Sequence, residues 1–424
     1  NRENYDKALE YLFAALEYCD EETSKDICAD LHLKIACVRT LQQDYENALK
    51  ELEETLRISP DLAEAWLVRT QVYTDTEQYR EAAQSLERYI ELSGDRASLE
   101  TLYQLYSKAG DTENALKSYQ AWLDASELGD AEKIYEMASY KMDSGLYTEA
   151  IADLETILND GEYGKAAAYR IGVCYMQAGD YAQAVEAFGR CADFASELDG
   201  ILYNTGVCYM QMEMYAEAIE AFGASYESES FRNDAIYNRA ICYLSQYGTE
   251  TEKDAAEAAL RAAVADFTAS LALTTEEAKA AAAEGEEVPE AVNIATYYRA
   301  ACYASLGEYD PAIADYTACI EADVSVEDSL FNRGLVQLQA GRMEEAREDL
   351  TSCIENGSHT DEALYYRSAV LDQLGEIQAA IDDLTACIEH GFSLGECYYQ
   401  RAQLYQKLGD MDHYMEDLEA SLNY

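Results

Sequence analysis

The residues best able to perform covalent or metal chemistry are the twelve cysteines and four histidines. No two cysteines are separated by two residues, so the paired spacing of a zinc ribbon is absent. The histidines lie far apart, and none stands in a His-Glu-x-x-His pattern; they are His32, His359, His390 and His413. We therefore expect no bound metal and no cofactor.

Other catalytic motifs are also missing from the sequence. There is no Gly-rich phosphate-binding loop and no turn carrying a nucleophilic Ser between small residues. The numerous acidic residues do not alternate as they do in a calcium-binding loop. We therefore predict that the chain is not an enzyme.

The chain is repetitive, with a period of about 34 residues. In each copy, apolar residues recur at helical spacing before and after one residue in a short turn, which we call the anchor residue. This pattern predicts a helix–turn–helix unit whose first helix ends at the anchor, as a C-terminal cap would end it. The anchors are Gln43, Glu77, Gly110, Gly145, Gly179, Glu213, Tyr247, Gly307, Gly341, Gly375 and Gly409.

Eight of the twelve cysteines occupy repeated positions, either five residues before an anchor or twelve after one. Other copies carry Ala, Ile or Ser there, and a buried free Cys behaves as a small hydrophobe. We therefore predict structural thiols and no structural disulfide, although Cys174 with Cys191, and Cys302 with Cys319, share a repeat and could oxidise. So many thiols favour a reducing or anaerobic compartment.

The repeat resembles the tetratricopeptide repeat. The family's motif residues are matched in two copies by Trp66, Tyr73, Ala82 and Leu86, and by Gly172, Tyr175, Ala184 and Phe188. The resemblance covers nearly the whole chain. It implies an all-α fold, a right-handed superhelical solenoid of about eleven helix–turn–helix repeats plus an N-terminal partial repeat.

We expect one continuous solenoid with four segments. Residues 1–28 form a partial repeat and linker, 29–247 the N-terminal repeats, 248–292 an irregular insertion with an elongated helix, and 293–424 the C-terminal repeats. Within the insertion, Gly285 and Pro289 are expected to mark a turn. The insertion is either a tolerated surface loop or a binding feature.

The sequence begins inside a repeat, because residues 5–16 match a second helix whose first helix is absent. A signal peptide, a membrane anchor or further repeats are all open for the preceding segment. No stretch of 18 apolar residues occurs, so this segment is not expected to span a membrane. The thiol content favours the cytoplasm, while an extracytoplasmic lipid-anchored form stays open.

The net charge is −53, from 30 Lys and Arg against 83 Asp and Glu. Such a charge argues against nucleic acid, whose binding needs a positive footprint, and against anionic lipid surfaces. One interpretation is a solvated acidic exterior that keeps the chain soluble; the other is a field that attracts a basic partner.

Arg and Asp recur together in the last five repeats. The Arg lies eight residues before the anchor, and in four repeats the Asp lies eight residues after it. In the repeat around Tyr247 the second helix is displaced by eleven residues, and the corresponding Asp is displaced with it. We predict structural ion pairs that set the register of the two helices, with an arginine row for an anionic ligand as the alternative. The pairs are Arg239 with Asp266, Arg299 with Asp315, Arg333 with Asp349, Arg367 with Asp383, and Arg401 with Asp417.

An aromatic residue lies ten positions before the anchor in eight successive repeats. In the resembled family this slot faces the concave groove, so the resemblance implies an aromatic strip that suits peptide binding; packing on the next repeat is the alternative role. We call these residues the aromatic strip: Tyr135, Tyr169, Tyr203, Tyr237, Tyr297, Phe331, Tyr365 and Tyr399. Expected neighbours are Met176, Met210, Gln177, Gln211, Gln339 and Gln373.

The family's best-known peptide mode holds a terminal carboxylate with Lys and Arg in the groove. Here the expected groove cations are few and scattered, so that mode is not expected; they are Lys34, Lys108, Arg170 and Lys407. We predict a non-enzymatic scaffold that binds a protein or peptide, including a basic one, in the concave groove. The alternatives are a structural or assembly module, or a regulatory repeat region of a larger or membrane-anchored protein.

Overall fold

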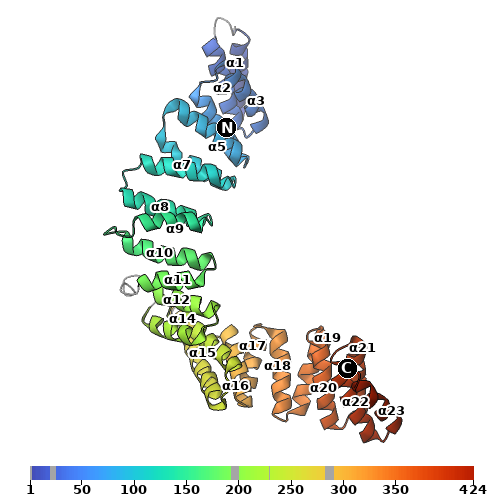
Figure 1. Ribbon diagram of the computed structural model, residues 1–424. Coiled ribbons are helices and arrows are strands. Elements are labelled where there is room, and N and C mark those ends of the chain that lie inside the picture. Colours follow the sequence, from blue (N-terminus) through green and yellow to red (C-terminus); the bar gives the residue numbers. More distant parts are fainter. Residues whose placement is uncertain (1, 20–24, 192–199, 229, 282–290) are drawn as a thin grey trace. The chain divides into compact units, whose positions relative to one another are not determined.

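The computed structural model describes residues 2–19, 25–191, 200–228, 230–281 and 291–424 (Figure 1). It divides into two compact units, Asn1–Asp180 and Tyr181–Tyr424. The described residues are helical and contain no strand. Within each unit, contacts run mainly between helices that are consecutive in the chain. The all-α helical solenoid expected from the sequence is therefore confirmed.

The described residues of unit 1 form ten α-helices and one short 3-10 helix. They are α1 (Arg2–Leu16), α2 (Lys25–Leu41), α3 (Tyr45–Ile58), α4 (Ala63–Asp75), α5 (Tyr79–Ser93), η1 (Arg96–Ser98), α6 (Leu99–Lys108), α7 (Thr112–Ala125), α8 (Asp130–Asp143), α9 (Tyr147–Thr156) and α10 (Gly164–Gln177).

Unit 2 continues the same alternation of first and second helices. Its described helices are α11 (Tyr181–Arg190), α12 (Ile201–Gln211), α13 (Tyr215–Ala224), η3 (Ser225–Glu227), α14 (Arg232–Thr249), α15 (Lys253–Ala281), α16 (Ile294–Ser305), α17 (Tyr309–Glu321), α18 (Val326–Gln339), α19 (Met343–Asn356), α20 (Thr360–Leu374), α21 (Ile377–His390), α22 (Leu394–Leu408) and α23 (Met411–Ser421).

Ten of the eleven anchor residues adopt a left-handed backbone conformation and end the first helix of their repeat. Seven are glycines, which reach positive φ without steric cost. The other three, Gln43, Glu77 and Glu213, have φ of 61°, 58° and 60° and carry the strain of a side chain there. The exception is Tyr247, which lies inside α14.

The small residue five positions after the anchor brings the two helices of a repeat together. Nine alanines at this position are 0–1% exposed, and so is Ala263, which takes the same role in the displaced second helix. Larger residues then fill the space between successive pairs, such as Leu52, Phe188, Phe222, Phe267 and Leu350, each at most 1% exposed. The core is therefore a continuous row of small clusters rather than one centre.

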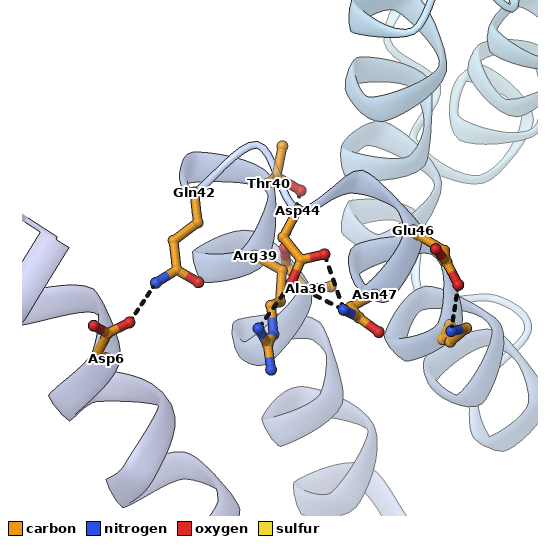
Figure 2. Close-up of polar contacts among 9 residues, drawn as sticks. Asp6, Ala36, Arg39, Thr40, Gln42, Asp44, Glu46 and Asn47 are labelled. Carbon is orange, nitrogen blue, oxygen red and sulfur yellow. Dashed lines mark hydrogen bonds and ion pairs between the residues drawn. The ribbon is translucent and has the colours of Figure 1, made fainter.

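Polar contacts fix the turn around the first anchor, Gln43 (Figure 2). Arg39 Nη1 donates to Asp44 Oδ2 at 2.8 Å, and Asn47 Nδ2 donates to Asp44 Oδ1 at 2.9 Å. Gln42 Nε2 donates to Asp6 Oδ1 at 2.8 Å and so joins this turn to α1. α1 thus packs on α2 and on the turn that follows it.

The insertion contains the longest described helix. α15 runs for 29 residues, Lys253–Ala281, where the sequence expects an elongated second helix. Its partner α14 extends to Thr249, which is why Tyr247 stays helical. The expected turn at Gly285 and Pro289 lies outside the described residues.

The expectation of a chain without disulfides is wrong at one place: Cys19 and Cys28 are bonded, with their Cα atoms 5.8 Å apart. Cys19 follows α1 and Cys28 lies in the first turns of α2. Both therefore lie outside the repeated small positions on which the expectation rested. The other ten cysteines are free.

Candidate partner-binding site

The structure brings each of the five predicted Arg–Asp pairs into two-pronged contact. In every pair, Nε and Nη2 of the Arg donate to the two carboxylate oxygens of the Asp at 2.7–2.8 Å. The Arg comes from the first helix of a repeat and the Asp from the second, in α14–α15, α16–α17, α18–α19, α20–α21 and α22–α23. Each pair therefore joins the two helices of its own repeat through two charge-assisted hydrogen bonds.

A threonine of the preceding repeat completes four of these contacts. Nη1 of the Arg donates to the Thr hydroxyl at 2.9–3.2 Å, in Arg299–Thr268, Arg333–Thr317, Arg367–Thr351 and Arg401–Thr385. The sequence analysis missed these residues, although a Thr ten positions after the anchor recurs beside the Arg and Asp. Arg239 is different, because Gly223 stands in the threonine position and offers no hydroxyl.

The paired arginines are occupied by the fold. Their side chains are 15–25% exposed, and four of the five Asp partners are buried. The hydrogen bonds to Asp266, Asp383 and Asp417 raise the pKa of Arg239, Arg367 and Arg401. Since the donors face a carboxylate and in four cases a hydroxyl, this arrangement favours the structural role over an arginine row for a ligand.

The rings of the aromatic strip pack against residues that precede the next first helix. Four of them meet an aromatic ring 27 or 28 residues later: Tyr135 with Tyr163, Tyr203 with Phe231, Phe331 with His359, and Tyr365 with Phe392, at centroid distances of 4.6–6.3 Å. The sequence analysis overlooked this second series of aromatic residues. This packing holds these four rings in place, and every strip residue is at least partly exposed.

The strip hydroxyls join neighbouring repeats through polar contacts. Tyr203 Oη and Tyr297 Oη accept hydrogen bonds from Asn238 Nδ2 and Asn332 Nδ2 at 3.1 and 3.0 Å, and each Asn lies one position after the next strip residue. Burial raises the pKa of Tyr203, Tyr237 and Tyr297. These tyrosines therefore stay neutral at physiological pH.

The last two strip residues differ in their environment. Burial, followed by the charge and hydrogen bond of Glu396, raises the pKa of Tyr365 to about 12. Tyr399 is the most open strip residue, with 44% of its surface exposed. The partial burial of the strip fits both roles considered for it, packing between repeats and contact with a partner.

Two pockets in unit 2 lie against strip tyrosines. One of about 410 Å³ is lined by residues of α16, α17 and α18, and another of about 240 Å³ by residues of α20, α21 and α22. Strip residues and exposed glutamines meet in both, since Tyr297 and Gln339 line the first pocket and Tyr365 and Gln373 the second. The other residues that line the first pocket are Ala301, Ala304, Ser305, Tyr316, Asn332, Leu335 and Val336. Those that line the second are Ser368, Ala369, Asp372, Leu384, Gln400 and Leu404.

The four cations expected in the groove all have partners. Lys34 Nζ lies 2.6 Å from Asp30 and Lys407 Nζ lies 2.6 Å from Asp372. Lys108 lies over the ring of Tyr79, and Arg170 lies 4.1 Å from the ring centroid of Tyr135 and contacts Ser139. Each cation is thus held by a carboxylate or a ring, which does not favour a terminal-carboxylate clamp.

Nine of the ten free cysteines are buried. Burial raises the pKa of Cys174, Cys208, Cys319 and Cys353 to about 11. Such thiols are poor nucleophiles at neutral pH. The exception in protonation is Cys397, whose pKa is lowered by a hydrogen bond with Cys387. Within the described part of the chain, no three His, Cys, Asp or Glu side chains are grouped closely enough to hold a metal ion.

The paired helices, the left-handed anchors and the contacts between consecutive helices define a helical-repeat protein. Comparison with family models agrees: models described as the tetratricopeptide repeat match residues 306–353, 331–387 and 395–424, and a model described as the anaphase-promoting complex, cyclosome, subunit 3 matches residues 143–225. The chain is a tetratricopeptide-repeat protein. Repeats of this family generally act as non-enzymatic scaffolds for protein–protein interaction, and this is the class that they indicate here.

Several solved structures are similar to the chain at low identity. The Naa15/Naa10 complex bound to HypK-THB matches with a TM-score of 0.44 and 14% identity over 98% of this chain, which spans 65% of the matched one. Human IFIT1, solved as a dimer with PPP-AAAA, matches with a TM-score of 0.36 and 15% identity. The match covers 93% of this chain and 90% of the IFIT1 chain.

A tetratricopeptide repeat protein from Parabacteroides merdae gives a TM-score of 0.40 and 15% identity over 65% of this chain and 98% of its own. No curated protein sequence matches the chain. Of the described helices, none combines the length and the hydropathy needed to cross a membrane.

Proposed function

We propose that the chain is a scaffold that binds an extended peptide segment of a partner protein along the aromatic strip of unit 2. The observation that carries this proposal is the pair of pockets at Tyr297 and Tyr365, each of which combines a strip ring with an exposed glutamine. An extended peptide offers backbone N–H and C=O groups to such amides and alternate side chains to the pockets. Both pockets lie on the regular C-terminal repeats, so their spacing suits one continuous ligand.

The rigidity of the strip supports binding rather than mere packing. A ring already fixed by its neighbour loses little conformational freedom when a ligand covers it, so more of the contact energy reaches the affinity. Aromatic side chains of this kind are the ones that most often dominate binding energy. The contact of Tyr365 with Phe392 and the stacking of Phe331 on His359 are therefore compatible with packing and with binding together.

The chemistry of the pockets suits binding and not catalysis. Their polar groups are amides, hydroxyls and the Asp372 carboxylate, which is already held by Lys407. Neither lining contains a Cys, Lys or His that could serve as nucleophile or base. The charge of −53 further favours a peptide with basic residues flanking the pocket-filling side chains.

A displayed library of random peptides tests this proposal. Peptides selected on the full chain are measured by calorimetry against Gln339→Ala, Gln373→Ala and the matched control Gln378→Ala, whose exposed side chain lies on the second helix α21. We expect the two pocket variants to weaken binding about tenfold each and the control to leave it unchanged. Equal affinity for all three variants would exclude these pockets as the binding site.

A further inference from the structure

A third pocket, of about 340 Å³, lies in unit 1, and no residue of the aromatic strip lines it. It is formed by α7, α8 and α9, of which α7 and α9 are second helices. Lys117, Lys133 and Lys141 line it, which gathers three of the chain's twelve lysines around one cavity. The net charge of the chain is −53, so a group of three lysines around one cavity differs in sign from the charge of the chain as a whole.

The three ammonium groups are in different states. Lys117 lies 2.6 Å from Glu113, a carboxylate that is 79% exposed, and Lys141 is paired with Asp153 at the pocket wall. In the described part of the chain, Lys133 has no ion-pair partner. Counted over these three lysines and their two ion-pair carboxylates alone, the local charge is +1, and the unpaired charge belongs to Lys133. Asp111 and Glu87 also act electrostatically on Lys117.

The rest of the lining is largely apolar. Leu116, Ile134 and Met137 form one wall, with Met137 only 6% exposed, and the Gln120 amide donates to Asp124 at 2.8 Å. A volume of this size lies within the range of sites that hold a small group of side chains or a small ligand. The cavity therefore offers an apolar wall beside one available positive charge.

We propose that this lysine pocket binds a segment of a partner protein that presents an Asp or Glu side chain next to an apolar residue. The carboxylate meets Lys133, with Lys117 and Lys141 at its sides, and the apolar side chain packs on Ile134 and Met137. A single carboxylate matches the local charge of +1, whereas a dianionic phosphate would exceed it. The lysine pocket is formed by helices other than those of the two strip pockets, so its test is independent of the test of the proposed function.

Methyl NMR of the full chain with a defined probe tests the lysine pocket. The probe is the blocked tripeptide acetyl-Leu-Glu-Leu-amide, and its Gln analogue removes the charge alone. We expect the Glu peptide to shift the methyl signals of Met137 and Ile134 in a saturable way, and Lys133→Gln to weaken binding about tenfold. Lys50→Gln is the control, because it removes one lysine charge at an exposed residue that does not line the pocket.

Three results would overturn the proposal. The first is equal shifts with the Glu and Gln peptides, which would indicate apolar binding alone. The second is equal loss of binding in Lys133→Gln and Lys50→Gln, which would indicate non-specific attraction. The third is tighter binding of the same peptide with phosphoserine in place of Glu, which would make the pocket a phosphate site.

Discussion

Arg367 donates two hydrogen bonds to Asp383, from Nε to Oδ2 at 2.8 Å and from Nη2 to Oδ1 at 2.7 Å, and a third from Nη1 to Thr351 of the preceding repeat. One side chain thus connects three helices, α19, α20 and α21. In a solenoid, where each repeat contacts only its neighbours, such a connection transmits stability along the chain. The first two predictions concern this contact.

Replacing Arg367 with Leu should destabilise the protein by roughly 3–5 kcal/mol, because it leaves Asp383 buried without its partner. Replacing Arg367 and Asp383 together, both with Leu, should cost less, since no buried charge then remains unpaired. Urea unfolding followed by circular dichroism measures both. A double variant that is as unstable as the single one, or less stable, would contradict a structural ion pair.

Thr351→Val should lower the free energy of unfolding by about 1 kcal/mol, because it removes the hydroxyl that accepts from Arg367 Nη1 and keeps the shape of the side chain. Thr268→Val is a parallel variant, because it removes the equivalent contact with Arg299. If the threonine links repeats, the two losses agree and the Thr351→Val effect vanishes in the Arg367→Leu background. An unchanged effect in that background would show that Thr351 acts through other contacts.

Glycine at the non-glycine anchors should stabilise the chain. Glu77→Gly and Glu213→Gly relieve a side chain at φ of 58° and 60°, and each should add about 1 kcal/mol. Gly307→Ala should cost a similar amount through backbone strain alone, because a Cβ atom there would meet nothing within 4 Å. Tyr247→Gly is the control and should destabilise, since Tyr247 lies inside α14 and packs on its core. Thermal unfolding of the four variants shows whether each substitution raises or lowers the stability as expected.

Stability should fall as the pH rises from about 9 to 11. Cys174 and Cys208 have pKa values raised by burial from an ordinary 9.0 to about 11. Below pH 9 these thiols are protonated in both the folded and the unfolded protein. Between about pH 9 and 11 they lose their protons in the unfolded chain but keep them in the folded protein. The free energy of unfolding therefore falls over this range and levels off above the pKa of the folded state. The urea midpoint at pH 7, 8.5, 9.5 and 10.5 measures the fall. Cys174→Ala with Cys208→Ala should make it shallower, and an identical slope would refute the role of these thiols.

Much of the fold is readable from the sequence because one repeat constrains the next. Small residues such as Ala312 mark where two helices meet, and the Arg–Asp spacing of 16 residues marks opposite positions on a helix pair. The disulfide between Cys19 and Cys28 escaped prediction because neither cysteine occupies a repeated position, so the period says nothing about them.

The surroundings of the strip were less accessible from the sequence. The partners of the strip, such as Phe231, could have been found from their own recurrence beside the strip. The pockets could not, since their volumes depend on small gaps between helices that no residue pattern encodes.

The central claim is that a partner peptide binds on the aromatic strip, and the affinity of a library-selected peptide for strip variants over a range of salt tests it most directly. Tyr203→Ala and Tyr365→Ala, checked for folding by circular dichroism, should each cost about 2 kcal/mol, or about 30-fold, at both 50 and 500 mM salt. Tyr309→Ala, on the second helix α17, should leave the affinity unchanged.

Charge reversal at the exposed Glu348 should mainly slow association, and added salt should have the same effect. Binding that is lost at 500 mM salt and indifferent to Tyr203→Ala and Tyr365→Ala would contradict the account and would make the acidic surface the recognition element.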